Sequence, residues 1–362
     1  MAEKVLVAMS GGVDSSVAAL LLKEQGYQVV GAHMKLWDYV DVGGDIYKDG
    51  RCCTIDSITD CRLVCDSIDA PFYVLNMSEH FRDTVINDFI SEYNKGRTPN
   101  PCVRCNSEVK WNSFLRKAKE LGCDYIATGH YAKIEKLENN HRYTVRKGND
   151  GSRDQSYVLW GVSQEALSKT LMPLGDFLKS EVRKIAHKYN LRTAEKKESR
   201  EICFIPDDNY RRFLIEYNHK NGKSFESGKI VHEDGTVLGE HKGTALFTIG
   251  QRKGMGISFP TPLYVKEINT KTNQVIVSDN DSLFSSELIA ENVNWVGMEP
   301  KEGSFSADVK IRYLHPPSSA KLECILDNRV KITFDEQQRA ITPGQSVVFY
   351  DNDILLGGGV IA

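Results

Sequence analysis

The sequence predicts an α/β domain, with a parallel sheet covered by helices on both faces, followed by two small β domains, the last a β-barrel. Up to residue 206, short apolar segments alternate with stretches of helical periodicity, which is typical of a buried parallel sheet. After Tyr217, Gly, Asn, Asp and Thr turn signals recur about every 8–12 residues, which is typical of all-β structure. We expect domains at 1–206, 207–270 and 271–362.

The elements of the first domain can be predicted in chain order. Strands are expected at 4–9, 27–34, 72–75 and 125–128, and helices at 15–24, 56–68, 79–93 and 110–121. The later strands are expected at 263–268, 274–278, 307–313, 320–326, 330–334, 346–350 and 354–361. Because ligands of parallel sheets bind at the carboxyl ends of the strands, we expect a site directly after the first strand.

Composition narrows the class of protein. With 362 residues, 41% of them hydrophobic, the chain can bury large cores. It shows neither an apolar window of membrane-spanning length nor a signal-peptide pattern, so we expect a cytoplasmic protein without membrane contact. Its nine cysteines indicate reduced thiols rather than a disulfide framework. A net charge of −3 does not indicate a nucleic-acid binder, so any RNA surface must be a local patch.

Residues 8–15, Ala-Met-Ser-Gly-Gly-Val-Asp-Ser, lie between the first strand and the first helix. Gly11 and Gly12 let backbone N–H groups approach an anion closely, and Ser10 and Ser15 add hydroxyl donors. The loop lacks the lysine of a Walker A motif. It therefore predicts a phosphate site that does not hydrolyse the γ-phosphate.

Residues 97–106, Arg-Thr-Pro-Asn-Pro-Cys-Val-Arg-Cys-Asn, present two cysteines. The prolines predict a rigid loop with no helix before residue 102, and Arg104 and Lys110 favour thiolate. A metal site, a redox dithiol and a single nucleophile with a neighbour all fit this loop. A metal would need ligands from Cys52, Cys53, Cys61 and Cys65. The helical spacing of Cys61 and Cys65 favours burial instead, so we expect no metal.

Cys203 follows a basic stretch. Between Arg183 and Arg200 there are seven basic residues and two acidic ones, a balance that supports a thiolate and attracts RNA phosphates. The alternative is a buried strand cysteine beside a solvated charge run. A phosphate loop combined with reactive cysteines favours ATP activation followed by sulfur transfer.

These features together carry a family resemblance. The Ser10–Ser15 run resembles the PP-loop of ATP pyrophosphatases, which cleave ATP between the α and β phosphates. Over the whole chain the sequence is similar to the tRNA-specific 2-thiouridylases of the MnmA/TrmU type. The motifs that carry this resemblance are Ser10–Ser15, Gly96–Asn106, Ala127–Ala132, Asp154–Tyr157, Ile202–Ile205 and Gly250–Gly254.

The resemblance implies a HUP (Rossmann-like) fold for the first domain and roles for single residues. Cys105 would be the nucleophile and Cys203 the persulfide carrier. ATP contacts would come from Ala8, Met9, Ser10, Gly11, Gly12, Val13, Asp14, Ser15, Met34 and Gly129. Contacts to tRNA would come from Asn100, Pro101, Cys102, His130, Arg153, Asp154, Gln155, Arg312, Tyr313 and Gln345. Some relatives have aspartate where Cys102 stands, which leaves the roles of Cys102 and Cys105 open.

The resemblance also implies the reaction and its partners. ATP with Mg²⁺ would adenylate the C2 oxygen of the wobble uridine, and a persulfide would replace it with sulfur, leaving a Cys105–Cys203 disulfide. The partners would be tRNA, whose target base must be flipped out, and a sulfur-donor protein. Two alternatives remain: an amidating ligase with the same loop, and a non-catalytic, ATP-dependent RNA-binding module.

Overall fold

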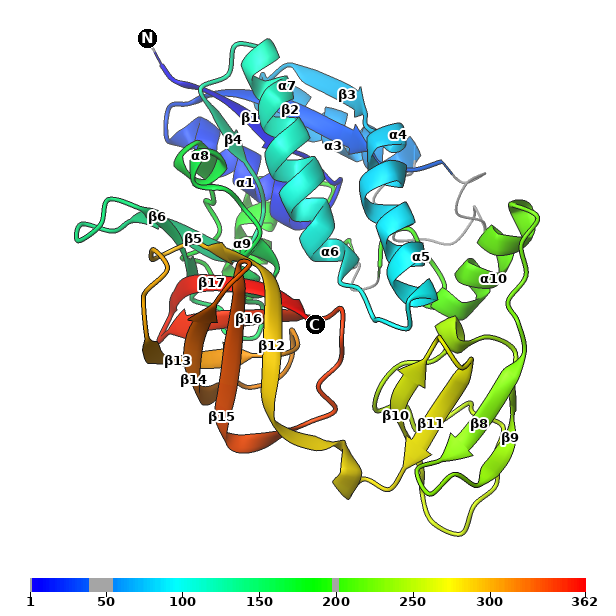
Figure 1. Cartoon of the computed structure of the whole chain (residues 1–362). Coiled ribbons are helices and arrows are strands. Elements are labelled where there is room, and N and C mark those ends of the chain that lie inside the picture. Colours follow the sequence, from blue (N-terminus) through cyan, green and yellow to red (C-terminus); the bar gives the residue numbers. More distant parts are fainter. Residues whose placement is uncertain (1, 39–54, 197–201) are drawn as a thin grey trace.

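The computed structural model describes residues 2–38, 55–196 and 202–362. The first domain is built on a parallel sheet in the order β3-β2-β1-β4-β7 (Figure 1). Its strands are β1 (Lys4–Ala8), β2 (Gln28–Lys35), β3 (Phe72–Asn76), β4 (Tyr125–Ala127) and β7 (Thr170–Leu171). All four pairings are parallel, so the predicted sheet is confirmed.

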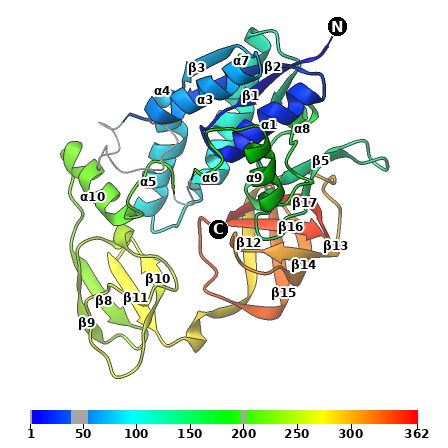
Figure 2. The same cartoon turned by 180° about the vertical axis from the view of Figure 1, so that it is seen from behind.

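Helices cover both faces of this sheet, as predicted (Figures 1 and 2). Side chains alternate along β1: Val5 and Val7 pack into one apolar cluster, and Leu6 packs into another on the opposite face. The helices of the Val5 face are α1 (Val13–Glu24), α3 (Ile55–Ser67) and α9 (Lys179–Lys188). Those of the Leu6 face include α4 (Ser78–Phe81), η1 (Arg82–Ile86), α5 (Asn87–Asn94), α6 (Pro101–Arg104), η2 (Cys105–Ser113), α7 (Phe114–Glu120) and α8 (Gln164–Ser168).

The middle domain follows α10 (Tyr210–Lys220) and is a four-stranded sheet with its own apolar core around Val265 and Val275. Its strands are β8 (Gly228–His232), β9 (Val237–His241), β10 (Tyr264–Asn269) and β11 (Gln274–Ser278). The β10–β11 hairpin crosses the division expected at residues 270–271. Strand pairing therefore puts the end of this sheet at Ser278.

The last part is a closed barrel, as predicted. Its strands run in the order β12-β15-β14-β13-β16-β17, and pairing between β12 and β17 closes the ring. They are β12 (Phe284–Trp295), β13 (Ser304–Lys310), β14 (Ser318–Ile325), β15 (Arg329–Arg339), β16 (Ser346–Asp351) and β17 (Ile354–Ile361). Closure removes the exposed strand edges that a sheet of this size would otherwise present.

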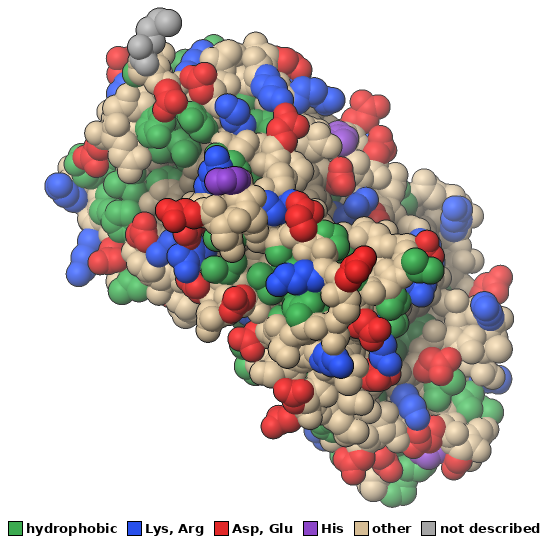
Figure 3. All heavy atoms as spheres, turned by 60° about the vertical axis from the view of Figure 1, so that its left-hand side comes forward, with side chains coloured by type: hydrophobic (Ala, Val, Ile, Leu, Met, Phe, Trp, Pro, Cys, Tyr) green, Lys and Arg blue, Asp and Glu red, His purple; other side chains and the backbone are tan. Residues whose placement is uncertain are grey.

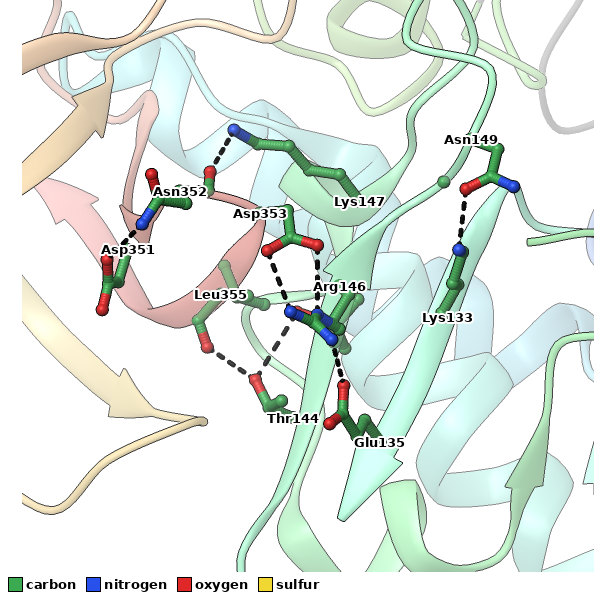
Figure 4. A network of polar contacts seen from close by, with 12 residues as sticks. Lys133, Glu135, Thr144, Arg146, Lys147, Asn149, Asp351, Asn352, Asp353 and Leu355 are labelled. Atoms are coloured by element: carbon green, nitrogen blue, oxygen red, sulfur yellow. Dashed lines mark hydrogen bonds and ion pairs between the residues drawn. The ribbon is translucent and has the colours of Figure 1, made fainter. Parts of the chain in front are cut away.

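A hairpin from the first domain extends the barrel sheet. It comprises β5 (Ala132–Lys136) and β6 (Tyr143–Lys147), and β6 pairs with β17. Arg146 lies between Glu135, at 2.7 Å, and Asp353, at 3.1 Å, while the Thr144 hydroxyl donates to the Leu355 carbonyl (Figure 4). The apolar core is continuous across this junction, since the Leu6 cluster also contains barrel residues. This hairpin was not expected from the sequence.

The surface carries charges of both signs. On the face shown in Figure 3, acidic and basic side chains are interspersed rather than gathered into a single-sign field. This mixture agrees with the small net charge of −3. Within the part of the chain that the structure describes, no helix combines the length and apolarity needed to cross a bilayer.

Candidate active site

The strand order places a switch point at the carboxyl edge of the sheet, between β1 and β4, where ligands of parallel sheets bind. The chain runs from β1 to β2 and β3 on one side and returns to β4 on the other, so the loops after β1 and β4 face each other. Gly129 lies in the loop after β4, and a Cβ there would lie 2.8 Å from the backbone of Asp14 and Ser15. Met34 lies at the same edge, near the end of β2. The predicted nucleotide residues are therefore brought together.

The loop after β1 is held in shape by its own serines. The backbone N–H of Ser10 donates to Ser15 Oγ at 3.1 Å, and the Ser15 hydroxyl donates to the Gly12 carbonyl at 3.2 Å. Gly11 has a φ of +74° and packs against α3, where a Cβ would lie 2.6 Å from the Ser57 carbonyl oxygen. Glycine is thus required here, and the loop leads directly into the first turn of α1, whose backbone amides are suited to an anion.

Asp14 is held by two partners that the sequence analysis did not single out. The Lys179 ammonium donates to both Asp14 carboxylate oxygens at 2.7 and 2.8 Å, and the Tyr131 hydroxyl donates at 2.7 Å. Lys179 begins α9, and the strand that precedes this helix, β7, ends at Leu171 and has only two residues. A strand this short leaves no periodic signal, so the position of Lys179 beside the loop could not be predicted from local patterns.

The two candidate cysteines on the proline-rich segment lie on a helix, which corrects the expected rigid loop. Asn100 caps α6, its side chain accepting from the Val103 N–H, and Pro101 occupies the first helical position, where the missing N–H costs nothing. Cys102 is exposed and Cys105 is buried. The π-helical stretch η2 begins at Cys105, a geometry frequent at functional sites.

Cys105 and Cys203 contact the same apolar cluster. Cys105 is 7% exposed within it, and Cys203 packs against it from the turn after the residues 197–201, which lie outside the described part. Phe204 anchors that turn through edge contacts with Phe81 and Phe89, at 5.7 and 5.3 Å between ring centroids. The structure thus brings two thiols that lie far apart in sequence to the same face of the sheet.

The other cysteines behave as small apolar residues. Burial raises the pKa of Cys61 and of Cys65 to about 12, so both stay protonated at neutral pH. Among the described residues no three His, Cys, Asp or Glu side chains form a metal-binding group. Cys52 and Cys53, the other two ligands considered for a metal, lie outside the described residues.

Lys110 lies close enough to His130 and to Cys102 to affect the pKa of both, and these three side chains are called the polar cluster. Burial lowers the pKa of His130 well below its usual value, helped by the positive charge of Lys110. Surrounding protein raises the pKa of the accessible Cys102 thiol, an effect that Lys110 opposes. The ring centroids of His130 and Trp111 lie 5.3 Å apart. Burial is the main cause that raises the pKa of Tyr313, and Cys102 is one of the smaller causes. His130 is therefore neutral at pH 7.

Several of the predicted tRNA contacts have partners inside the protein. The Asp154 carboxylate accepts from Ser156, and Gln155 exchanges hydrogen bonds with the Tyr131 backbone. Arg312 donates to the carbonyl of Ala340, and the Gln345 side chain donates to the carbonyls of Thr98 and Pro99, at 3.0 and 3.3 Å. These side chains stabilise loops of the site, and their contact with tRNA stays a prediction.

A cavity of about 690 Å³ lies on the opposite face of the α6–η2 helix. Helix residues Val103, Arg104 and Ser107 line it, whereas Cys102 and Cys105 do not. Residues 291–294 of β12 form its far wall. The cavity is therefore separate from the thiols.

Comparisons with known proteins agree with this geometry. Family models described as "tRNA methyl transferase HUP domain", "tRNA methyl transferase PRC-barrel domain" and "Aminomethyltransferase beta-barrel domain" match residues 3–207, 212–279 and 285–361. A tRNA-specific 2-thiouridylase MnmA of Clostridioides difficile is 47% identical over 100% of this chain and 98% of its own length. One from Geotalea uraniireducens is 49% identical over 99% and 95%. The chain therefore belongs to the family of tRNA-specific 2-thiouridylases and is a tRNA sulfurtransferase.

Proposed function

We propose that this enzyme replaces the C2 oxygen of the wobble uridine of tRNA with sulfur, in an ATP-dependent reaction that uses Cys105 and Cys203. The observation that carries the proposal is that both thiols contact the same apolar cluster. This cluster lies on one face of the sheet, and the phosphate loop lies at the carboxyl edge of that sheet. We further propose that it works in the cytoplasm, where its thiols stay reduced.

The first step activates the base. A uracil C2 oxygen is a poor leaving group, so it attacks the α-phosphate of ATP, and pyrophosphate leaves. The amides at the start of α1 stabilise the phosphate charge in place of a Walker lysine. Mg²⁺ would be bound by the ATP phosphates and by water, since the Asp14 carboxylate is already held by Lys179.

The second step transfers sulfur. Cys203 arrives as a persulfide, loaded by a donor protein. The Cys105 thiolate attacks the Sγ atom of Cys203, the S–S bond of the persulfide breaks, and hydrosulfide leaves with the electron pair. Hydrosulfide adds to C2 and expels AMP, which takes the original oxygen with it. A Cys105–Cys203 disulfide remains, and a thiol reductant restores both cysteines.

The polar cluster would receive the base. C2 lies within the stacked anticodon loop, so the nucleotide must be flipped out before it can react. Neutral His130 and the N-capping Asn100 offer hydrogen bonds to a uracil edge, and Cys102 lies between them in the chain. The barrel, with the exposed Tyr313, would bind the body of the anticodon stem-loop.

The test is reconstitution of the full-length enzyme with ATP, Mg²⁺, a persulfide donor and unmodified tRNA. We expect thiolated uridine by mass spectrometry, AMP and pyrophosphate as products, and at least about a 100-fold loss of rate for Cys105→Ala and Cys203→Ala. Cys324→Ala, which removes a barrel thiol, is the matched control. Cys102→Ser decides which thiol of the α6 helix is the nucleophile.

Each alternative has its own outcome. If Cys105→Ala and Cys203→Ala both still thiolate tRNA, the sulfur-transfer step is wrong. Release of ADP and phosphate contradicts activation at the α-phosphate. Formation of AMP without tRNA would favour an amidating ligase, and tRNA binding without any ATP turnover would favour a non-catalytic module.

A further inference from the structure

The phosphate loop, residues 8–15, contains no positively charged side chain to balance the charge of a bound triphosphate. Residues 8–15 contain no cation, and their carboxylate, Asp14, is neutralised by Lys179. A bound triphosphate would bring several negative charges to this loop. Backbone amides and a helix N-terminus supply only partial positive charge.

A second cation lies next to the loop, on the α3 side. Ser57, in the first turn of α3, packs directly against Gly11. The Lys196 ammonium lies 3.3 Å from the Ser57 hydroxyl and 2.8 Å from an Asp60 carboxylate oxygen, one turn further along the helix. Ser57 is therefore in contact with both Lys196 and Gly11.

The local charge around Lys196 is in surplus. Asp60 is 7% exposed and pairs with Arg192 at 3.3 Å as well as with Lys196. Among the described residues, two cations therefore share this carboxylate, which balances only one of their two positive charges. Arg192 can hold Asp60 alone if Lys196 turns toward another anion, so no buried carboxylate would be stranded.

The charge of Lys196 also reaches the groups beneath the loop. It adds to the burial that lowers the pKa of His33, whose Nδ1 lies 3.0 Å from the carbonyl oxygen of Met9. Met9 is itself the residue before Ser10. The charge of Lys196 therefore acts on His33, which contacts Met9 at the start of the phosphate loop.

We propose that Lys196 supplies the cation missing from the phosphate loop and binds the pyrophosphate half of ATP. This inference rests on the proposed ATP-dependent function. On nucleotide binding the ammonium leaves Asp60, which Arg192 retains, and donates to β- and γ-phosphate oxygens. Charge develops on the leaving pyrophosphate as the α-phosphate is attacked, so the same contact favours activation.

The experiment compares affinities for ATP and AMP in the full-length protein by titration calorimetry. We expect Lys196→Met to weaken ATP binding about 10- to 100-fold and to leave AMP binding within about twofold. Arg192→Met, which removes the other cation on Asp60, is the matched control and should bind ATP as the parent does. Lys196→Arg should recover part of the affinity.

The outcomes separate the two proposals. ATP binding by Lys196→Met equal to that of the parent overturns the inference, as does an equal loss for ATP and AMP. If the parent protein itself binds no ATP, the proposed function fails and the inference with it. Should Lys196→Met be too unstable to measure, Asp60→Asn/Lys196→Met, which also removes the buried carboxylate, makes the same comparison with the same expected loss.

Discussion

At the scale of single residues, the buried His33 makes the stability of the protein depend on pH. It is 1% exposed on β2, its Nδ1 faces the Met9 carbonyl, and its Nε2 has no hydrogen-bond partner among the residues that the structure describes. Burial, the largest cause, lowers its pKa, and Lys196 adds to the effect. The folded protein therefore keeps His33 neutral at pH values where an unfolded chain takes up a proton.

The sign of the pH dependence follows from this. Stability is full above pH 6.5 and falls as the pH drops below it, because only the unfolded state then gains a proton at His33. The slope from one such group is at most about 1.4 kcal/mol per pH unit. We expect His33→Asn, whose amide can still donate to Met9, to flatten the loss of unfolding free energy between pH 7.5 and about 5.5.

Urea denaturation at both pH values measures this effect. His141→Asn, at an exposed histidine, is the control and should keep the parent's pH dependence. An identical slope in His33→Asn and the parent would show that the proton uptake lies elsewhere.

Cysteine chemistry could be predicted only in part at this scale. Helical spacing predicted the burial of Cys61 and Cys65, because periodicity reports which face of a helix is covered. The prolines were misread as excluding a helix before residue 102, although Pro101 is compatible with the first position of one. Lys179 was missed, since only the tertiary fold places it on Asp14.

At the scale of elements, the segment before α6 is fixed by the barrel. The Thr98 N–H donates to the Pro343 carbonyl, and the Gln345 side chain donates to Thr98 and Pro99. Between them, Gly344 has a φ of +88°, and a Cβ there would lie 2.9 Å from the Thr98 nitrogen. The helix that carries both cysteines is therefore positioned by a turn of another domain.

Gly344→Ala tests this contact. A positive φ alone costs alanine about 1 kcal/mol or more, and the clash adds to that cost. We expect a lower unfolding free energy and a lower thiolation rate, measured by denaturation and by the tRNA assay. Gly26→Ala is a matched control, since Gly26 has a φ of +90° with open space around it. Equal losses in both variants would mean that the contact with Thr98 is unimportant.

The elements themselves were predicted where burial is strong. The apolar strands β1, β2 and β11 and the helix α1 match their expected ranges to within one or two residues. The β5–β6 hairpin was missed because its residues are largely charged, and the partner that orders it, β17, lies more than 200 residues away. Local patterns do not contain that information.

At the scale of the whole molecule, the core of the first domain extends onto the barrel, although the inside of the barrel forms a cluster of its own. Trp160 packs against Gly358, the Tyr157 hydroxyl donates to the Ser346 carbonyl, and Asn294 donates to the Trp160 carbonyl. The middle sheet, in contrast, has a separate core. The division into three sequence domains therefore does not describe three independent folding units.

A fragment of residues 1–206 tests this organisation. We expect it to lack full hydrogen-exchange protection in β5 and β6 and to unfold with lower cooperativity than the full chain, because β17 and the shared core are missing. Adding a barrel fragment of residues 284–362 should restore the protection. Full protection and a sharp transition in the fragment alone would contradict the shared core.

The contact between Gln345 and Thr98 also has a consequence in time. The two residues are 247 positions apart. At a synthesis rate of about 5–20 residues per second, roughly 10–50 s pass between the synthesis of Thr98 and that of Gln345. During this time the helix that carries Cys102 and Cys105 lacks the contact that positions it. A polypeptide stalled or cut short within the barrel would already contain the phosphate loop and the cysteines proposed to react, but the segment that carries Cys105 would not yet be fixed. We therefore expect only completed chains to thiolate tRNA.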